Sequence, residues 1–137
     1  MKKNHTVYLA LGSNLGDKNH NLHHAITLIA ERVGTLSAIS SIYETKAWGF
    51  ESDHSFFNQV VKVKTHLAPL ELLAITQTIE KEIGRTEKTN HTYKDRIIDI
   101  DIILYDDLIY ESKKLTLPHP LYKERDFVMK PLLEILE

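Results

Sequence analysis

Hydrophobic positions in the first third of the chain predict a strand followed by a helix. Residues 7–11 form a nearly continuous apolar run, which is typical of an interior strand. The turn-forming stretch 12–17 is expected to end this strand, and Asp17 is placed to cap the next helix. Apolar residues then recur with helical spacing as far as Val33, and Gly34 is expected to end that helix.

The middle of the chain predicts two further strands and a second helix. Residues 36–45 alternate as one strand, and residues 56–65 alternate as the next. In the latter segment, Phe56 and Asn58 share one face of the strand. A helical stripe then begins at Pro69, a residue suited to the first turn of a helix, and Gly84 follows it as a stop.

The last third opens with the most unusual strand of the chain, residues 96–105. A hairpin over residues 108–117 is expected after it, and then an apolar segment, 128–136, which Pro131 interrupts and which is expected to be helical after that residue. The order of elements predicts an α+β fold, a ferredoxin-like βαββαβ sandwich with an appended β-hairpin and a C-terminal helix. Residues 1–137 are expected to form a single domain, with helices on one face of the sheet and the other face available.

Asp99 and Asp101 give the strand 96–105 its unusual character. Isoleucines surround both aspartates, which predicts a strand covered on both faces in the middle of a sheet. Aspartate is depleted in strands, and alternation places these two side chains on one face, with Cα atoms about 7 Å apart. Paired carboxylates on a rigid strand suit Mg²⁺, although a solvated sheet face is the ordinary alternative. Arg96, three residues before Asp99, favours a phosphate site.

Composition restricts the partners of such a domain. The 137 residues are 42% hydrophobic, which is enough for one compact core. A formal net charge of -2 gives no overall attraction to nucleic acid or to an anionic membrane. The absence of cysteine excludes disulfides and thiolate chemistry. No apolar stretch near the N-terminus is long enough for a signal peptide or a membrane span, so an intracellular type of domain is expected.

Other segments carry weaker signals. The glycine loop 12–17 lacks the pattern of a phosphate-binding loop, so a structural turn is the better interpretation. The segment 46–54 holds the only tryptophan, either as part of a binding loop or as a tucked anchor. Phe56 and Asn58 could stack on and hydrogen-bond to a flat ring, although a core phenylalanine beside a turn-capping asparagine is the more ordinary interpretation. Gln77 and Glu80 share a helix flank, which is ordinarily solvated.

Several separated stretches of the chain match one family in the family's own order. The matching stretches are Leu11–Asp17, Tyr43–Thr45, Phe57–Asn58, Arg96 with Asp99 and Asp101, Leu117–Pro120, and Arg125 with Phe127. In this combination the chain resembles the 6-hydroxymethyl-7,8-dihydropterin pyrophosphokinases of folate biosynthesis. The resemblance implies transfer of pyrophosphate from ATP to the pterin hydroxymethyl group, which leaves AMP.

The resemblance also implies roles for individual residues. Asp99 and Asp101 would bind two Mg²⁺ ions and would be catalytic together with Arg85 and Arg96. Phe56 and Phe127 would stack on the two sides of the pterin. The other implied pterin contacts are Gly12, Thr45, Trp48 and Asn58. The implied ATP contacts are Gln77, Glu80, Arg85, Arg96, Ile102, Lys114, Thr116, His119 and Arg125.

One segment departs from the family pattern. Where the family carries a further arginine and a Trp-Gly-Pro run, this chain has Glu87 and residues 92–95, Thr-Tyr-Lys-Asp. Lys88 or Tyr93 is expected to substitute. The polar loop 85–94 leads directly into the aspartate strand and is expected to close over the site.

Two other classes compete with this interpretation. A nucleotidyl-transfer palm also pairs strand carboxylates, but this chain is too small and too acidic for a templated polymerase. A ferredoxin-like nucleotide- or RNA-binding module without catalysis would need exposed aromatics and a basic surface. The sequence therefore favours a cytoplasmic, monomeric, Mg-dependent enzyme acting on ATP and a pterin, without nucleic-acid or membrane partners.

Overall fold

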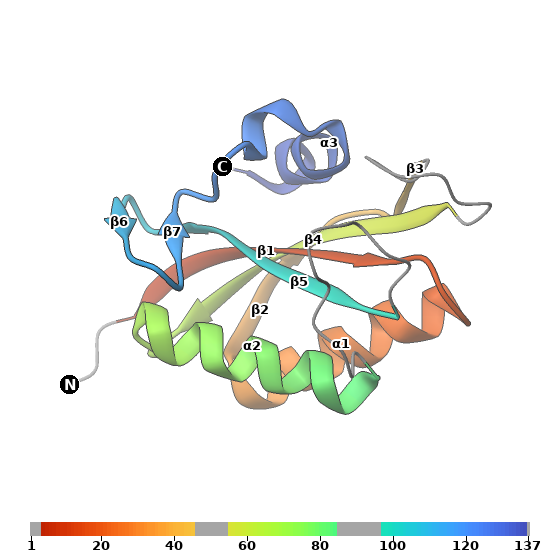
Figure 1. The fold of residues 1–137 in the computed structure, drawn as a ribbon, viewed down its shortest axis with the longest axis horizontal. Coiled ribbons are helices and arrows are strands. Elements are labelled where there is room, and N and C mark those ends of the chain that lie inside the picture. Colours follow the sequence, from red (N-terminus) through yellow and green to blue (C-terminus); the bar gives the residue numbers. More distant parts are fainter. Residues whose placement is uncertain (1–3, 46–54, 85–96, 137) are drawn as a thin grey trace.

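Three layers make up the fold: two helices, a central antiparallel sheet, and a third helix on the opposite face (Figure 1). The computed structural model describes residues 4–45, 55–84 and 97–136. In chain order the elements are β1 (His5–Ser13), α1 (Lys18–Arg32), β2 (Gly34–Ile39), β3 (Tyr43–Thr45), β4 (Phe56–Thr65), α2 (Pro69–Ile83), β5 (Asp99–Tyr105), β6 (Tyr110–Glu111), β7 (Thr116–Leu117), a 3-10 turn (Tyr122–Glu124) and α3 (Asp126–Ile135).

The main sheet has the strand order β2-β4-β1-β5, with β3 also paired to β4. All of its strand pairs are antiparallel, while β6 and β7 form the expected separate hairpin. This arrangement confirms the α+β class. Since β1 lies between β4 and β5, its nearly uniform apolar sequence is explained by cover on both faces.

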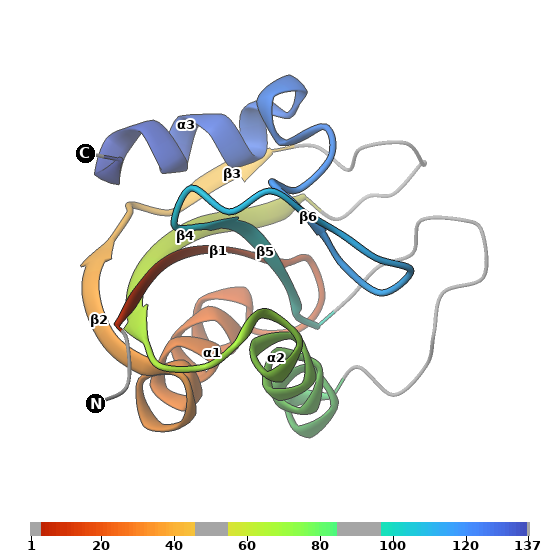
Figure 2. The ribbon, with the colours of Figure 1, turned by 90° about the vertical axis from the view of Figure 1, so that its left-hand side faces the viewer.

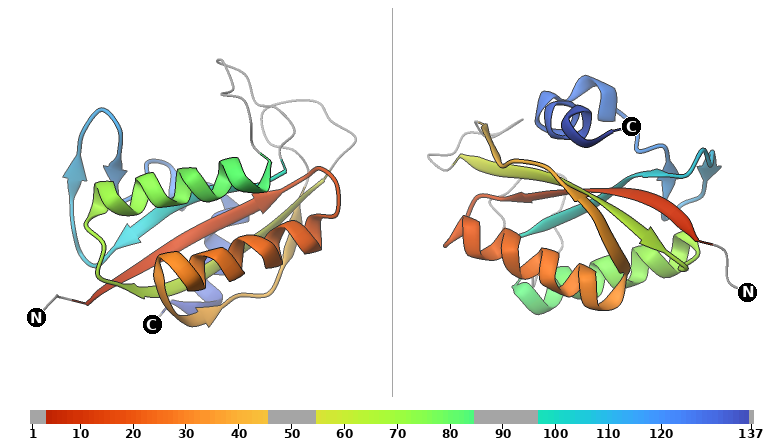
Figure 3. Two further views of the ribbon diagram at one scale, coloured as in Figure 1. Left: turned by 90° about the horizontal axis from the view of Figure 1, so that it is seen from below. Right: turned by 180° about the vertical axis from the view of Figure 1, so that it is seen from behind.

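Helices α1 and α2 lie side by side on one face of the sheet, which is called the helical face below (Figure 3). Odd-numbered residues of β1, such as Val7, Leu9 and Leu11, pack there with Ile29 of α1 and Ile79 of α2. Asp17 caps α1 as expected, because its side chain accepts a hydrogen bond from the backbone N–H of His20.

The opposite face, called the α3 face below, carries the C-terminal helix (Figure 2). Val128 and Leu132 of α3 pack there on Tyr8, Val60 and Ile103. The expectation that this face is available is therefore wrong for the part that α3 covers. The helix also begins earlier than expected, at Asp126, and runs through Pro131.

The strand with the two aspartates lies at the edge of the described sheet, and the expectation of a central strand is wrong. β5 pairs with β1 alone, and its ladder shifts by one residue so that Ile103 becomes an extra residue. Ile103 and Leu104 consequently both contact the α3 face, whereas Ile102 and Tyr105 face the helices. The bulge explains why this apolar run does not alternate.

The expected strand over residues 36–45 is two strands, β2 and β3. At the break, the Ser40 hydroxyl accepts a hydrogen bond from Val60 N–H at 2.9 Å, in place of a backbone carbonyl. The Ser40 N–H in turn donates to the Val60 carbonyl at 2.9 Å. Because the Ser40 hydroxyl takes the place of a backbone acceptor, the chain can bend here while the polar backbone groups stay paired.

Two glycines differ from expectation. β1 does not end before Gly12, because Gly12 pairs with Asn58 on one side and Asp99 on the other. α1 ends at Arg32 with Val33 as its cap, and Gly34 is instead the first residue of β2. A Cβ on Gly34 would lie 2.0 Å from the Lys64 carbonyl oxygen, so only glycine fits this close approach.

Candidate active site

The α3 face carries a row of candidate site residues across adjacent strands. Asn58 of β4 is the register partner of Gly12 of β1, and Gly12 is the partner of Asp99 of β5. Tyr43 of β3 continues the row as the partner of Asn58. Strand pairing therefore brings together four residues that lie in separate parts of the sequence.

The centre of this row has almost no side chain. A Cβ on Gly12 would meet Asn58 Oδ1 and Phe56 Cδ1 at 3.6 Å each, which are ordinary contact distances. The next β1 residue on the same face, Ala10, is also small and pairs with Asp101. Small residues in the middle with functional side chains on both flanks provide room for a flat ligand.

Asp99 and Asp101 share the α3 face, as strand alternation predicts, and both are half-buried. Among the residues that the structure describes, no group of three or more His, Cys, Asp or Glu could hold a metal ion. Two carboxylates still fit Mg²⁺, which commonly takes one or two of them and fills its other positions with water and phosphate oxygens. The donor set thus suits a metal that arrives with a phosphate substrate.

Asn58 is buried and its amide is held by β3. Its Nδ2 donates to the Tyr43 carbonyl at 3.1 Å and to the Thr45 hydroxyl at 2.8 Å. The interpretation of Asn58 as a turn cap is wrong, because it lies within a strand and links β4 to β3. This donation fixes the amide with its oxygen on the side of Gly12.

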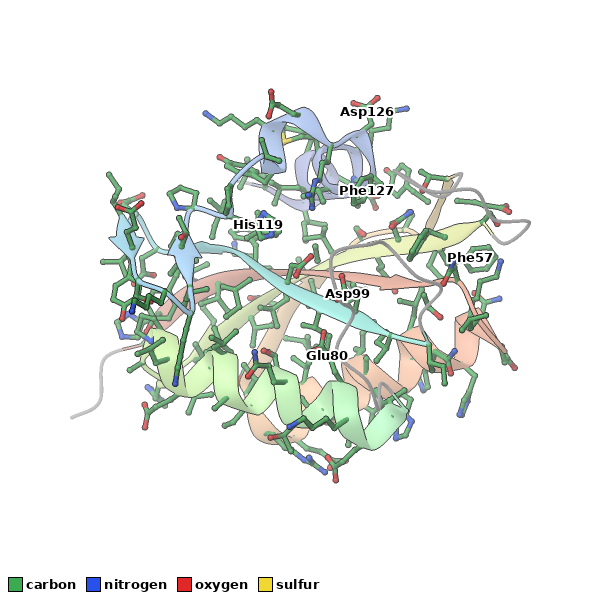
Figure 4. All side chains as sticks on the ribbon, in the orientation of Figure 1. Phe57, Glu80, Asp99, His119, Asp126 and Phe127 are labelled. Atoms are coloured by element: carbon green, nitrogen blue, oxygen red, sulfur yellow. The ribbon has the colours of Figure 1, made fainter. Side chains whose placement is uncertain are left out.

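Side chains near the start of α3 lie over the same face. Phe127 is half-buried, and the guanidinium carbon of Arg125 lies 5.7 Å from the centre of its ring. Figure 4 shows Phe127 and His119 on the α3 side of the sheet, together with Asp99. The pKa of His119 lies below its ordinary value, mainly because the ring is buried. The Pro120 carbonyl and Asp99 act in the opposite direction, and the nearby Arg125 lowers the pKa further. A guanidinium, an imidazole and a carboxylate therefore share this region.

Glu80 lies on the other side of the sheet, on α2 (Figure 4). It is buried, and its Oε2 accepts a hydrogen bond from Ile100 N–H at 2.7 Å, so the interpretation of a solvated flank is wrong for this residue. Because backbone directions alternate along a strand, the Ile102 N–H points to the same outer edge of β5 as the Ile100 N–H, an edge that no described strand pairs with. The Ile102 side chain itself is buried on the helical face.

The remaining expected residues lie farther from the row or outside the described part. Gln77 is exposed on α2, Lys114 is exposed in the β6–β7 turn, and Thr116 is half-buried on β7. Trp48, Arg85 and Arg96 lie outside the described residues, as does the loop 85–94 with its expected closure.

Sequence reasoning missed a cluster beside the site. Glu134 of α3 accepts hydrogen bonds from the backbone and hydroxyl of Ser41 and from the hydroxyl of Tyr43. Roughly ninety residues separate Glu134 from its partners, so no local pattern could have indicated the contact. The family-matching stretch Tyr43–Thr45 was the one sequence feature that pointed to this region.

An open depression of about 410 Å³ lies elsewhere, between the start of α2 and the end of β5. Its lining includes His5, Pro69 and Tyr105, together with Asp106 and Asp107. Asp106 there already accepts a hydrogen bond from Thr6 N–H and lies 2.7 Å from His5 Nδ1, so the paired aspartates of the α3 face remain the better candidate site for a metal-bound phosphate.

Comparison with known proteins agrees with this geometry. Residues 8–137 match the model of the family described as 7,8-dihydro-6-hydroxymethylpterin-pyrophosphokinase (HPPK). The chain belongs to the HPPK family. The match includes the whole row from Gly12 to Asp99.

HPPK relatives named 2-amino-4-hydroxy-6-hydroxymethyldihydropteridine pyrophosphokinase occur in several bacteria. The Porphyromonas gingivalis protein is 50% identical over 133 residues, which covers 94% of this chain and 89% of the relative. The Aquifex aeolicus protein is 48% identical, with 95% of this chain and 79% of the relative covered. The Bacillus subtilis protein is 42% identical, with 98% and 80% covered.

Solved structures share the fold at low identity. A Plasmodium falciparum HPPK-DHPS triple mutant with STZ-DHP matches with a TM-score of 0.78 and 16% identity, over 99% of this chain. The wild-type P. falciparum protein with pterin and p-hydroxybenzoate matches with a TM-score of 0.75 and 18% identity, also over 99% of this chain. This chain spans 40% of the length of either protein, and the likeness concerns the fold alone.

Proposed function

We propose that this chain transfers the pyrophosphoryl group of ATP to the hydroxymethyl oxygen of 6-hydroxymethyl-7,8-dihydropterin, giving AMP and the pterin pyrophosphate for folate biosynthesis. Membership of the HPPK family and the names of its relatives support this activity. The row Asn58–Gly12–Asp99 is the observation that carries the proposal, because it sets an amide and an open floor beside a candidate metal carboxylate. A non-catalytic RNA-binding module is not favoured by the family match.

The pterin is proposed to lie over Gly12 with its edge toward Asn58. Its ring would stack between Phe56 of β4 and Phe127 of α3, since both side chains belong to the α3 face. Thr45 holds the Asn58 amide and so contributes to the same edge. Trp48 is proposed as a further contact from the family pattern.

The phosphates are proposed to lie next to Asp99 and Asp101, which would hold two Mg²⁺ ions. When bound, Mg²⁺ would supply positive charge to the phosphate oxygens. Arg125 would add positive charge from the α3 side, where the His119 imidazole could donate a hydrogen bond, and Arg85 and Arg96 are proposed to supply further positive charge from the family pattern. Holding the pterin hydroxymethyl group and the phosphate chain on adjacent strands would orient the two substrates for transfer.

The rest of ATP is proposed to follow the open edge of β5. The Ile102 backbone is the natural contact there, because Glu80 already occupies the Ile100 N–H. Glu80 would then act by holding the strand in place rather than by touching the nucleotide. Gln77, Lys114 and Thr116 are proposed as outer contacts on α2 and the β6–β7 hairpin.

We also infer a ferredoxin-like fold for residues 1–137 as a single domain, which the strand order β2-β4-β1-β5 supports. A monomeric, cytoplasmic enzyme is proposed. Within the described residues, no helix has the length and apolar character needed to cross a membrane.

A direct assay tests the proposed activity. The protein is incubated with ATP, Mg²⁺ and 6-hydroxymethyl-7,8-dihydropterin, and the nucleotide products are separated by chromatography. AMP should form together with pterin pyrophosphate, and omission of either Mg²⁺ or the pterin should stop it. Formation of ADP, or of AMP at an equal rate without the pterin, would overturn the proposal.

A further inference from the structure

The carboxylate of Glu134 joins the end of α3 to the segment that leads into β3. Oε1 and Oε2 lie 3.1 and 3.0 Å from the Ser41 backbone nitrogen, which donates to them. The Ser41 hydroxyl donates to Oε2 at 3.0 Å, and the Tyr43 hydroxyl donates to Oε1 at 2.8 Å. The Tyr43 bond is the main reason why the pKa of Glu134 lies below its ordinary value.

A second set of hydrogen bonds continues from Tyr43 into the proposed pterin subsite. The Tyr43 carbonyl accepts from the Asn58 amide at 3.1 Å, and the same amide nitrogen donates to the Thr45 hydroxyl at 2.8 Å. β3 is only three residues long, and among the described strands it pairs with β4 only. The Ser55 hydroxyl also donates to Glu44 of β3 at 2.5 Å. Glu134 is therefore one of the main restraints on its position.

The same helix carries a pterin contact near its other end. Phe127 lies seven residues before Glu134, or about 10 Å along the helix axis. Val128 and Leu132 already anchor α3 to the sheet through buried apolar contacts. Exposed polar contacts such as those of Glu134 usually add little stability, so their main effect here is on geometry.

We propose that Glu134 is a positioning residue for the pterin subsite, whose carboxylate fixes β3 against α3 and so sets Asn58 and Thr45 in register with Phe127. The inference rests on the proposed pterin subsite. Glu134 itself does not touch the pterin in this account. It acts through Ser41 and Tyr43.

Three variants test this role, with pterin and ATP affinities measured separately by calorimetry. Glu134→Ala should weaken pterin binding by about tenfold while ATP affinity stays within about twofold, because only the pterin contacts depend on β3. Tyr43→Phe removes one of the hydrogen bonds and should cause a smaller loss in the same direction. Glu134→Gln keeps oxygen and nitrogen atoms near the partners and should restore part of the affinity.

A matched control lies on the helical face. Glu82→Ala removes an exposed carboxylate that pairs with Arg32 on the face of the sheet opposite β3 and α3, and should leave the pterin affinity unchanged. If Glu134→Ala does not fold, Tyr43→Phe and Glu134→Gln carry the test. A pterin affinity within twofold of wild type in the folded Glu134 variants, or equal losses for pterin and ATP, would overturn the positioning role.

Asn58→Ala separates this inference from the proposed site itself. If Asn58→Ala weakens pterin binding and the Glu134 variants do not, the positioning role is wrong and the subsite stands. If Asn58→Ala leaves pterin binding intact, the subsite is wrong and the positioning role falls with it.

Discussion

The two faces of the sheet serve different purposes. On the helical face, residues such as Leu9, Ile29 and Ile79 are fully buried beneath α1 and α2. On the α3 face, apolar packing covers only part of the sheet, and the row Asn58–Gly12–Asp99 combines an amide, a glycine and a carboxylate. The helical face supplies most of the core, and we propose that the α3 face carries the chemistry.

Replacing Asp99 or Asp101 on the α3 face should have the largest effect on turnover. Asp99→Ala or Asp101→Ala should lower turnover by about 100- to 1,000-fold or more, because charge stabilisation at the phosphates is lost. The folded state should persist, since each change also relieves repulsion between neighbouring carboxylates. Turnover and thermal unfolding are both measured, with the exposed Asp107→Ala as the control. Near-normal turnover in either aspartate variant would remove that residue from the metal site.

Truncating one buried side chain on each face of the sheet should have different consequences for pterin binding. Ile29→Ala and Leu132→Ala should each lower the free energy of unfolding by about 2–5 kcal/mol, because both side chains are buried. Leu132→Ala alone should also weaken pterin binding, since Leu132 anchors the helix that carries Phe127. Urea unfolding and calorimetry at low temperature measure the two effects. Equal pterin affinity in the two variants would mean that α3 does not shape the site.

The aromatic pair gives a smaller and more local effect. Phe127→Ala should weaken pterin binding by about 1–3 kcal/mol through lost stacking, with a much smaller change for ATP. Phe56→Tyr should be nearly silent, because the ring is kept. Calorimetric titration with each substrate distinguishes the two cases. An unchanged pterin affinity in Phe127→Ala would exclude that residue from the subsite.

Two glycines provide a direct contrast between the faces. Gly12→Ala places a Cβ at ordinary contact distances of 3.6 Å, so stability should hardly change, while the floor of the pterin site is partly filled. Pterin affinity should fall by about tenfold, or 1.4 kcal/mol. Gly34→Ala should instead prevent stable folding, because its Cβ would lie 2.0 Å from a backbone oxygen. Circular dichroism and pterin titration measure both, and normal pterin binding by Gly12→Ala would contradict the proposed floor.

The periodic parts of the fold were predictable from sequence, and the long-range polar contacts were not. The hydrophobic spacing predicts α1, β4 and α2 closely. Strand alternation predicts that Asp99 and Asp101 lie on the same face of the sheet. The break before β3 depends on the Ser40–Val60 contacts, which alternation cannot indicate. The burial of Glu80 likewise depends on one distant backbone N–H.

The smallest expected effect concerns pH and Glu134. Its pKa is lowered in the folded protein, so its contribution to stability is present above the ordinary glutamate pKa of about 4.3 and is lost as pH falls through the lowered value. Glu134→Gln should therefore show a shallower loss of stability over that acid range than the unmodified protein. Thermal unfolding at a series of pH values measures this, and identical pH profiles would show that the carboxylate contributes nothing.

The position of the pterin ring tests the central claim most directly. A crystal structure of the protein with 6-hydroxymethyl-7,8-dihydropterin, Mg²⁺ and a non-hydrolysable ATP analogue would locate it. The ring should lie over Gly12, between Phe56 and Phe127 with its edge at Asn58, and the phosphates should lie beside Asp99 and Asp101. A pterin found instead in the depression lined by His5, Pro69 and Tyr105, or on the helical face, would contradict the account.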